Sequence, residues 1–212
     1  MSNTVKHEHA PGLQVPSLSS PQMRRILASS FLGSAIEFYD FILYATAASL
    51  VFNKIFFTNL TPGVAIFASF ATLAVGYLAR PLGGIVFGHF GDKMGRKGVL
   101  ITSMAMMGGA STLIGLLPPT AQVGMLAPIA LIVLRVVQGL AVGGEWGGAM
   151  LMALEHAPKE RRGFAASFAN MGGPAGAVMA TLAVSAVSLL PDDQFLAWGW
   201  RSPFILSIAL VG

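Results

Sequence analysis

Five long apolar runs constrain the fold of this chain more than any other feature. Their approximate ranges are 26–52, 63–89, 98–118, 123–154 and 164–190. A helix needs about 20 apolar residues to cross a hydrocarbon core about 30 Å thick. A sixth run, near 203–212, is only half a bilayer long as a helix. The sequence therefore predicts an all-α integral membrane protein in which the sixth helix is truncated, as expected of a fragment.

The composition agrees with lipid as the main solvent of the chain. Hydrophobic residues make up 54% and charged residues 10% of the sequence, whereas a soluble domain carries about 25% charged residues. Cysteine is absent, which excludes disulfides and thiolate metal sites. The basic residues lie in short clusters between apolar runs, the pattern of membrane loops, so we reject nucleic acid as a partner and expect no metal and no cofactor.

Residues 1–22 are polar and rich in Ser, Pro and His, and we expect them to form a disordered cytoplasmic tail. Residues 23–212 are predicted to form one transmembrane bundle. The first apolar run, from Ile26, is too long for the core of a signal peptide. It is therefore predicted to remain as a spanning helix.

The basic residues alternate between the two sides of the predicted bundle. One side has three clusters of three: Lys6, Arg24 and Arg25; Lys93, Arg96 and Lys97; and Lys159, Arg161 and Arg162. The opposite loops have only Lys54 and Arg201. Since cytoplasmic loops carry the excess of Lys and Arg, the N-terminus and both basic turns are predicted to be cytoplasmic.

Glycines are frequent in the apolar runs and are expected to let helices approach closely. On the fourth predicted helix, two overlapping pairs with a spacing of four are formed by Gly143, Gly144, Gly147 and Gly148. We interpret these as packing residues only. In the fifth, the segment 172–174 (Gly-Gly-Pro) predicts a kink.

Ionisable residues inside a membrane are costly and usually functional. Glu37 and Asp40 are three residues apart and share one face of the first helix. Two close carboxylates in a low-dielectric medium should not both ionise unless a cation neutralises one, which is the behaviour that a proton carrier needs. The structural alternative is that they pair with Arg80 and Arg135.

Depth favours a contact between Asp40 and Arg135, because both fall in the middle of the bilayer when counted from opposite sides. Protonation of Asp40 would then release Arg135. Arg80 has two open roles: it neutralises Glu37, or it binds a substrate carboxylate as a fork. Glu145 is either a second protonatable site or a partner for a neighbouring helix.

Several motifs in this order resemble the major facilitator superfamily. They are the loop motif Gly88–Leu100, the helix motif Arg135–Gly139, and Glu155–Pro158 followed by Arg162–Gly163. Four further segments resemble the metabolite–proton symporters, a family of bacterial carriers of organic acids and zwitterions: Glu37–Phe41, Ala79–Gly84, Gly143–Gly148 and Gly199–Phe204. The likeness runs from about residue 25 to the end.

The resemblance implies a fold of two six-helix halves with the substrate between them, of which this chain is the N-terminal half. It implies a multi-pass protein of the bacterial inner membrane with a missing C-terminal half as its partner. The proton-coupling residues would be Asp40, Arg135 and Glu37. The substrate contacts would be Arg80, Tyr39, Gln138, Glu145 and Asn170.

The resemblance also implies a cytoplasmic gate, which closes the cytoplasmic side in the outward-open state. Its residues would be Gly88, Asp92, Gly95, Arg96, Glu155 and Arg162. In this gate Arg96 pairs with Glu155. Asp92 lies against a helix of the second half.

The function predicted from these residues is secondary active transport: proton-coupled uptake of a small organic acid or zwitterion by alternating access. The segment 173–176 (Gly-Pro-Ala-Gly) matches the antiporter signature of the superfamily only in part, which lowers the weight of exchange. The alternatives are a proton-independent facilitator or exchanger, and a truncated membrane protein that does not transport. An enzyme is not predicted, because no nucleophile–base pair, metal cluster or phosphate loop is visible.

Overall fold

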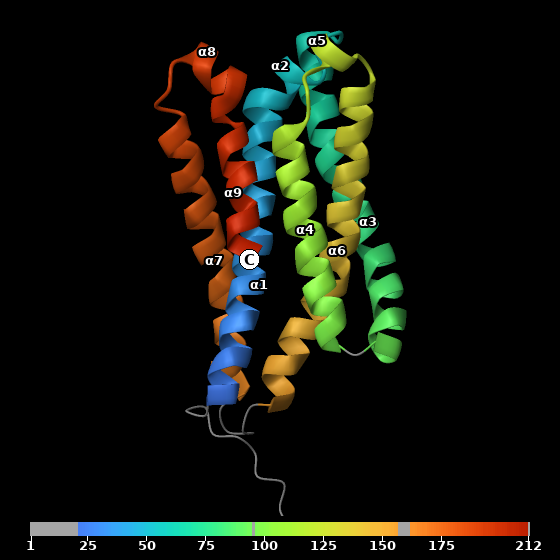
Figure 1. The fold of residues 1–212 in the computed structure, drawn as a ribbon, viewed down its shortest axis with the longest axis vertical. Helices are drawn as coiled ribbons and strands as arrows, with labels where there is room; N and C mark the ends of the chain where they lie inside the picture. The colour runs from blue at the N-terminus through green and yellow to red at the C-terminus, as the bar shows by residue number, and fades with distance from the viewer. Residues whose placement is uncertain (1–20, 95, 157–161, 212) are drawn as a thin grey trace, which may run out of the picture.

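The computed structural model describes residues 21–94, 96–156 and 162–211, and within these ranges the fold is helical with no strand. The long helices run side by side along the longest axis of the molecule (Figure 1). They are α1 (Pro21–Ala47), α3 (Pro62–Met94), α4 (Arg96–Leu116), α6 (Leu126–His156) and α7 (Arg162–Val187). A sixth helix, α9, covers Arg201–Val211. The predicted all-α fold is confirmed.

The connections alternate between the two ends of the bundle. The short helices α2 (Asn53–Ile55), α5 (Thr120–Val123) and α8 (Asp192–Gln194) lie at one end. The starts of α1, α4 and α7 lie at the other end (Figure 1). Two of the three predicted basic clusters fall in part outside the described residues, but the helices that flank all three begin or end at this same end.

The stretch Gly88–Leu100, which we expected to be a turn, is helical on both sides of residue 95. Helix α3 continues to Met94 and α4 begins at Arg96. Lys, Met and Arg have high helix propensity, so the charged residues here extend the helices rather than end them. The expectation that the whole of Gly88–Leu100 forms a turn is therefore wrong.

Two other boundaries differ from the expected ranges. The first run leaves α-geometry at Ala47 and continues as a π-helix, η1 (Ala48–Phe52), before α2. In the fourth run, Gly124 has a φ of 60°, a conformation that glycine adopts without steric cost. It ends α5, and α6 then begins at Leu126.

Four segments of the described residues are long and apolar enough to span a membrane: Met23–Ile55, Pro62–Gly91, Gly98–Leu116 and Leu126–Gly144. Helix α7 is not among them, although the sequence predicted a span there and the helix has 26 residues. Its first half contains Asn170, two adjacent glycines and Pro174, which lower its mean hydropathy. Length alone therefore supports α7 as a span.

Glycines bring neighbouring helices into backbone contact. Helix α3 packs along α6, and α1 packs along α7. A Cβ atom added to Gly143 of α6 would lie 2.0 Å from the carbonyl oxygen of Arg80 in α3, and one added to Gly176 of α7 would lie 2.0 Å from that of Ala35 in α1. The packing role predicted for Gly143 and Gly144 is confirmed, while Gly147 and Gly148 lie outside the residues whose packing is described.

Aromatic side chains form the core at the α2 end of the bundle. The Phe52 ring makes edge contacts with Phe56 and Trp200, with ring centroids 5.4 and 5.9 Å apart. Beside this core, Nη1 of Arg201 donates to the carbonyl oxygens of Gly115 at 2.7 Å and of Leu117 at 2.6 Å. Arg201 thus satisfies carbonyls at the end of α4, which a helix leaves without partners, and fixes α9 against α4.

Candidate functional site

A cluster of polar side chains is buried among α1, α4 and α6. Asp40 of α1 and Arg135 of α6 are each 4% exposed, and Gln138 and Ser111 are each 1% exposed. Nη1 of Arg135 lies 3.5 Å from Oδ2 of Asp40. Nε2 of Gln138 lies 3.0 Å from both carboxylate oxygens, and Ser111 Oγ makes a hydrogen bond to Oδ1. The contact predicted between Asp40 and Arg135 is present.

Helical spacing explains why α6 supplies two of these groups. Arg135 and Gln138 are three residues apart, so they lie on one face of α6. Nη1 of Arg135 donates to Oε1 of Gln138 at 3.1 Å, while the amide nitrogen of Gln138 faces Asp40. Gln138 therefore connects the cation to the anion through its two ends.

The guanidinium of Arg135 also lies over an aromatic ring. Its Cζ atom is 4.0 Å from the ring centroid of Tyr44, one turn beyond Asp40 on α1. The Tyr44 hydroxyl donates to Oγ1 of Thr72 at 2.6 Å, and Thr72 donates to the carbonyl of Ser69 at 2.6 Å. A cation over a ring face in a desolvated site is stabilised by about 2 kcal/mol, so Tyr44 is part of the environment that the buried charge requires.

One donor of Arg135 has no acceptor. Its Nε is buried without a hydrogen-bond partner. The neighbouring backbone belongs to Gly76 of α3, where an added Cβ would lie 2.6 Å from Nε. The absence of a side chain at Gly76 therefore leaves the space that Arg135 occupies.

A second ion pair lies one turn away. Nη1 of Arg80 in α3 is 3.4 Å from Oε1 of Glu37 in α1. The side chain of Arg80 is 29% exposed and that of Glu37 is 7% exposed. Cζ of Arg80 lies 4.4 Å from the ring centroid of Tyr77. Of the two roles left open for Arg80, neutralisation of Glu37 is the contact present here.

The two ion pairs border one small cavity. Its free volume of about 10 Å³ is close to the space that a single water molecule needs. The lining residues come from α1, α3 and α6: Glu37, Asp40, Phe41, Gly76, Arg80, Arg135, Gln138, Gly139 and Val142. The site is therefore polar and nearly filled by its own side chains.

Two predicted substrate contacts, Tyr39 and Asn170, do not join this cluster, and a third, Glu145, cannot be placed. The hydroxyl of Tyr39 donates to the carbonyl oxygen of Pro203 at 2.9 Å, so this side chain faces α9. Asn170 is exposed on α7. Glu145 lies on α6, but its side chain is outside the described residues. A role in substrate binding stays a prediction for all three.

Most of the predicted gate residues also lie outside the part of the chain that the structure describes. Gly88 is exposed on α3, and Arg162 is exposed at the first position of α7. Gly95 and the side chains of Asp92, Arg96 and Glu155 lie outside the described residues. The pairing of Arg96 with Glu155 stays a prediction.

Sequence reasoning missed Ser111, Tyr44 and Thr72. Ser111 is one of several hydroxyl residues in α4, and nothing in its neighbours distinguishes it. Its spacing of four from Met107 places the two residues on one face of α4, but only the structure shows that this face is buried. That face could not be matched to Asp40 without the arrangement of the helices.

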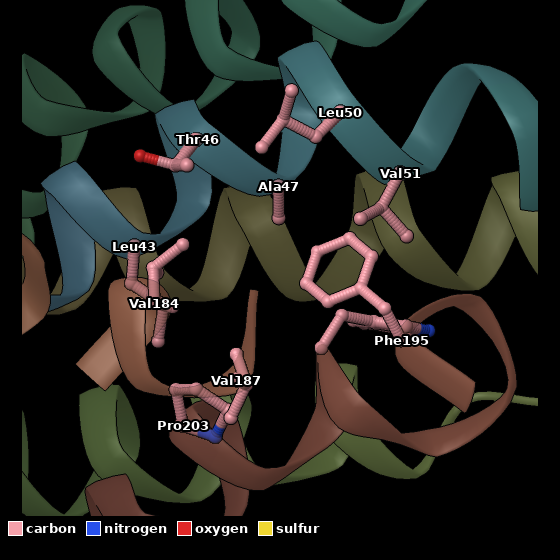
Figure 2. Close-up of a pocket in the computed structure, with 10 residues that line it drawn as sticks. Leu43, Thr46, Ala47, Leu50, Val51, Val184, Val187, Phe195 and Pro203 are labelled. Carbon is pink, nitrogen blue, oxygen red and sulfur yellow. The ribbon is translucent and has the colours of Figure 1, made fainter. Parts of the chain in front are cut away.

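A separate pocket near the α2 end is almost entirely apolar (Figure 2). Its lining side chains come from α1, η1, α7, η3 (Phe195–Gly199), α9 and the turn between η3 and α9: Leu43, Thr46, Ala47, Leu50, Val51, Val184, Val187, Phe195, Trp200 and Pro203. It has no charged group to orient a polar ligand. In the part of the chain that the structure describes, no group of three or more His, Cys, Asp or Glu side chains suits a metal ion.

Comparison with known proteins decides the family. Residues 21–212 match the family model described as "Major Facilitator Superfamily". The chain belongs to the major facilitator superfamily. It is 49% identical to the shikimate transporter of Escherichia coli over 92% of this chain and 44% of that protein. It is 37% identical to the proline/betaine transporter of the same organism over 89% of this chain and 38% of that protein.

Solved structures of the superfamily have the same fold. The crystal structure of a D-xylose-proton symporter matches with a TM-score of 0.77 at 17% identity, covering 89% of this chain and 46% of that one. The inward-open xylose transporter of E. coli matches with a TM-score of 0.71 at 16% identity, over 89% of this chain and 46% of that one. The chain spans less than half the length of the relatives that it matches. It corresponds to the N-terminal six-helix half of the superfamily fold, as the sequence predicted.

Proposed function

We propose that this chain is the N-terminal half of a secondary active transporter that couples uptake of a small carboxylate or zwitterion to protons. The observation that carries the proposal is the buried Asp40, which lies 3.5 Å from Arg135 inside an apolar helix bundle. A charge in such a place is costly and is usually part of an ion or substrate pathway.

The coupling follows from the two protonation states of Asp40. When the carboxylate is ionised, it neutralises Arg135. When it takes up a proton, Arg135 keeps its charge because a guanidinium does not lose its proton in proteins. The unpaired cation then favours a carboxylate from the substrate, or a rearrangement of α1 against α6. Release of the proton restores the ion pair and returns the transporter to its resting state.

The substrate class follows from the fixed charges and agrees with the names of the relatives. Arg80 is partly exposed beside Glu37, so a substrate carboxylate displacing Glu37 would meet a cation, and a zwitterion would meet both charges. Relatives of this chain are named for shikimate and for proline and betaine. We propose the same broad class for this chain.

We further propose a bacterial inner-membrane location, with the basic end of the bundle in the cytoplasm. Support comes from the charge asymmetry of the loops and from a relative named as an inner membrane metabolite transport protein of E. coli, 49% identical over 88% of this chain and 43% of that protein. The predicted gate residues, including Arg162, would then close the cytoplasmic side.

The test is Asp40→Asn in the full transporter that contains this chain, reconstituted in proteoliposomes. We expect proton-driven accumulation to be lost and substrate counterflow to remain, because asparagine keeps the size but cannot exchange a proton. Asp192→Asn, an exposed residue of α8, is the matched control. Uphill uptake that persists in Asp40→Asn would sink the proposal. Substrate addition that leaves the external pH of the wild type unchanged would point to a proton-independent facilitator.

A further inference from the structure

Ser111 has one hydroxyl hydrogen and two acceptors in range. Its Oγ atom contacts Oδ1 of Asp40 and lies 3.0 Å from the carbonyl oxygen of Met107, one turn earlier on α4. The amide nitrogen of Gln138 lies 2.7 Å from the same Oγ. A hydroxyl donates once and accepts twice, so it satisfies only one of the two acceptors at a time.

With Asp40 ionised, the Ser111 hydroxyl and Oδ1 of Asp40 both have partners. The hydroxyl hydrogen of Ser111 bonds Oδ1 of Asp40, and Gln138 donates to the hydroxyl oxygen. A hydrogen bond to an ionised acceptor is about twice as strong as one between neutral groups. The hydroxyl therefore favours Asp40 over Met107 in this state.

With Asp40 protonated, the same atoms fit a second arrangement. The carboxylate gains one proton at Oδ1, and the new O–H bond donates to the Ser111 oxygen. The Ser111 hydrogen then turns to the Met107 carbonyl, while Gln138 continues to donate. In this second arrangement neither Oδ1 of Asp40 nor the Ser111 hydroxyl is left without a partner, which would cost about 1–3 kcal/mol.

We propose that Ser111 is a positioning residue for proton coupling, whose hydroxyl switches its acceptor between Asp40 and Met107 as Asp40 takes up and releases the proton. This inference rests on the proposed function. It adds a residue of α4 to a mechanism otherwise built from α1 and α6.

The other neighbours of Asp40 do not offer the acceptor that a protonated Oδ1 needs. Arg135 from α6 and Arg80 from α3 have only donors. Oε1 of Gln138 already accepts from Arg135. On α1 itself, the Tyr44 hydroxyl is bonded to Thr72 and Glu37 is paired with Arg80. Among the described contacts of Oδ1, Ser111 Oγ is the atom that can accept.

The experiment compares Ser111→Ala with Ser103→Ala in the full transporter. Ser103 is a suitable control because it is buried on the same helix and donates to the carbonyl of Leu100 at 3.0 Å, two turns from the site. Two readouts are followed against pH: proton-coupled uptake, and the infrared band of a protonated carboxyl group that Asp40→Asn removes.

We expect both midpoints to shift by about one pH unit in the alkaline direction in Ser111→Ala, because the ionised carboxylate loses a charge-assisted hydrogen bond. Ser103→Ala should keep the wild-type midpoints. Ser111→Thr retains the hydroxyl and should restore them. Wild-type midpoints in Ser111→Ala, or the alanine midpoints in a folded Ser111→Thr protein, would overturn the inference.

The two proposals fail in different ways. If Asp40→Asn still accumulates substrate uphill, the proton-coupled function falls and the role of Ser111 falls with it. If Asp40→Asn loses accumulation while Ser111→Ala titrates like the wild type, only the switching hydroxyl is wrong.

Discussion

The two ion pairs of this bundle begin on the same face of α1, three residues apart, yet their surroundings differ. The Asp40–Arg135 pair is enclosed by Gln138, Ser111 and a tyrosine ring. In the Glu37–Arg80 pair, the arginine is 29% exposed and lies over the ring of Tyr77. The two pairs are thus one helical turn apart, but Arg135 is enclosed with its partner Asp40 whereas Arg80 is partly exposed.

The difference in burial bears on which pair can serve proton coupling and which can contact a substrate. A fully enclosed pair changes its surroundings strongly when one charge is neutralised, because no solvent screens the remaining charge. A partly exposed pair can exchange its partner at low cost. We therefore propose the inner pair for coupling and Arg80 of the outer pair for contact with a substrate, while the coupling role of Glu37 stays a prediction.

The largest expected effect is a difference in stability between variants that lack the carboxylate of one pair or the other. Asp40→Ala leaves the permanent charge of Arg135 buried, and we expect a loss of about 3–5 kcal/mol in the free energy of unfolding. Glu37→Ala leaves Arg80 only partly buried, so we expect a smaller loss than in Asp40→Ala. Denaturant unfolding of both variants in the same detergent measures the contrast. Equal losses would mean that the two pairs do not differ in their environment.

A smaller effect is expected from the glycine beside the inner pair. Gly76→Ala places a Cβ 2.6 Å from Nε of Arg135, so the Arg135 side chain must shift from its position beside Asp40. We expect a cost of about 1–3 kcal/mol in unfolding free energy together with weaker proton-coupled uptake. Gly109→Ala on α4, where an added Cβ meets nothing within 4 Å, is the control. Wild-type uptake in Gly76→Ala would show that the inner pair tolerates displacement.

The sequence predicted the inner pair better than its surroundings. Asp40 and Arg135 could be matched because charges are rare in apolar helices and both lie at the same depth. The role of Arg80 stayed open between neutralising Glu37 and binding a substrate carboxylate, since depth alone does not show which face of α3 meets α1. Ser111 and Tyr44 could not be found, because small hydroxyls and single aromatic residues are ordinary in membrane helices.

The fold, like the site, was predictable only in part. The apolar runs located the helices, but not where each one ends. Helix α3 extends to Met94 through charged residues that hydropathy assigns to a turn. Helix α7 packs on α1 through Gly172 and Gly176, and the residues that allow this contact also reduce the apolar signal. Where packing needs small residues, hydropathy underestimates the span.

The smallest expected effect concerns the two rings under the arginines. Tyr44→Phe keeps the ring over Arg135 but removes the hydrogen bond to Thr72, so we expect a cost of about 1 kcal/mol. Tyr77→Phe removes a hydroxyl from a side chain that is 42% exposed and should leave stability unchanged. Because both rings remain, proton-coupled uptake should keep its pH dependence in each variant. A shifted pH profile in Tyr44→Phe would instead place the Tyr44–Thr72 hydrogen bond in the coupling machinery, and the enclosed pair would then extend to α3.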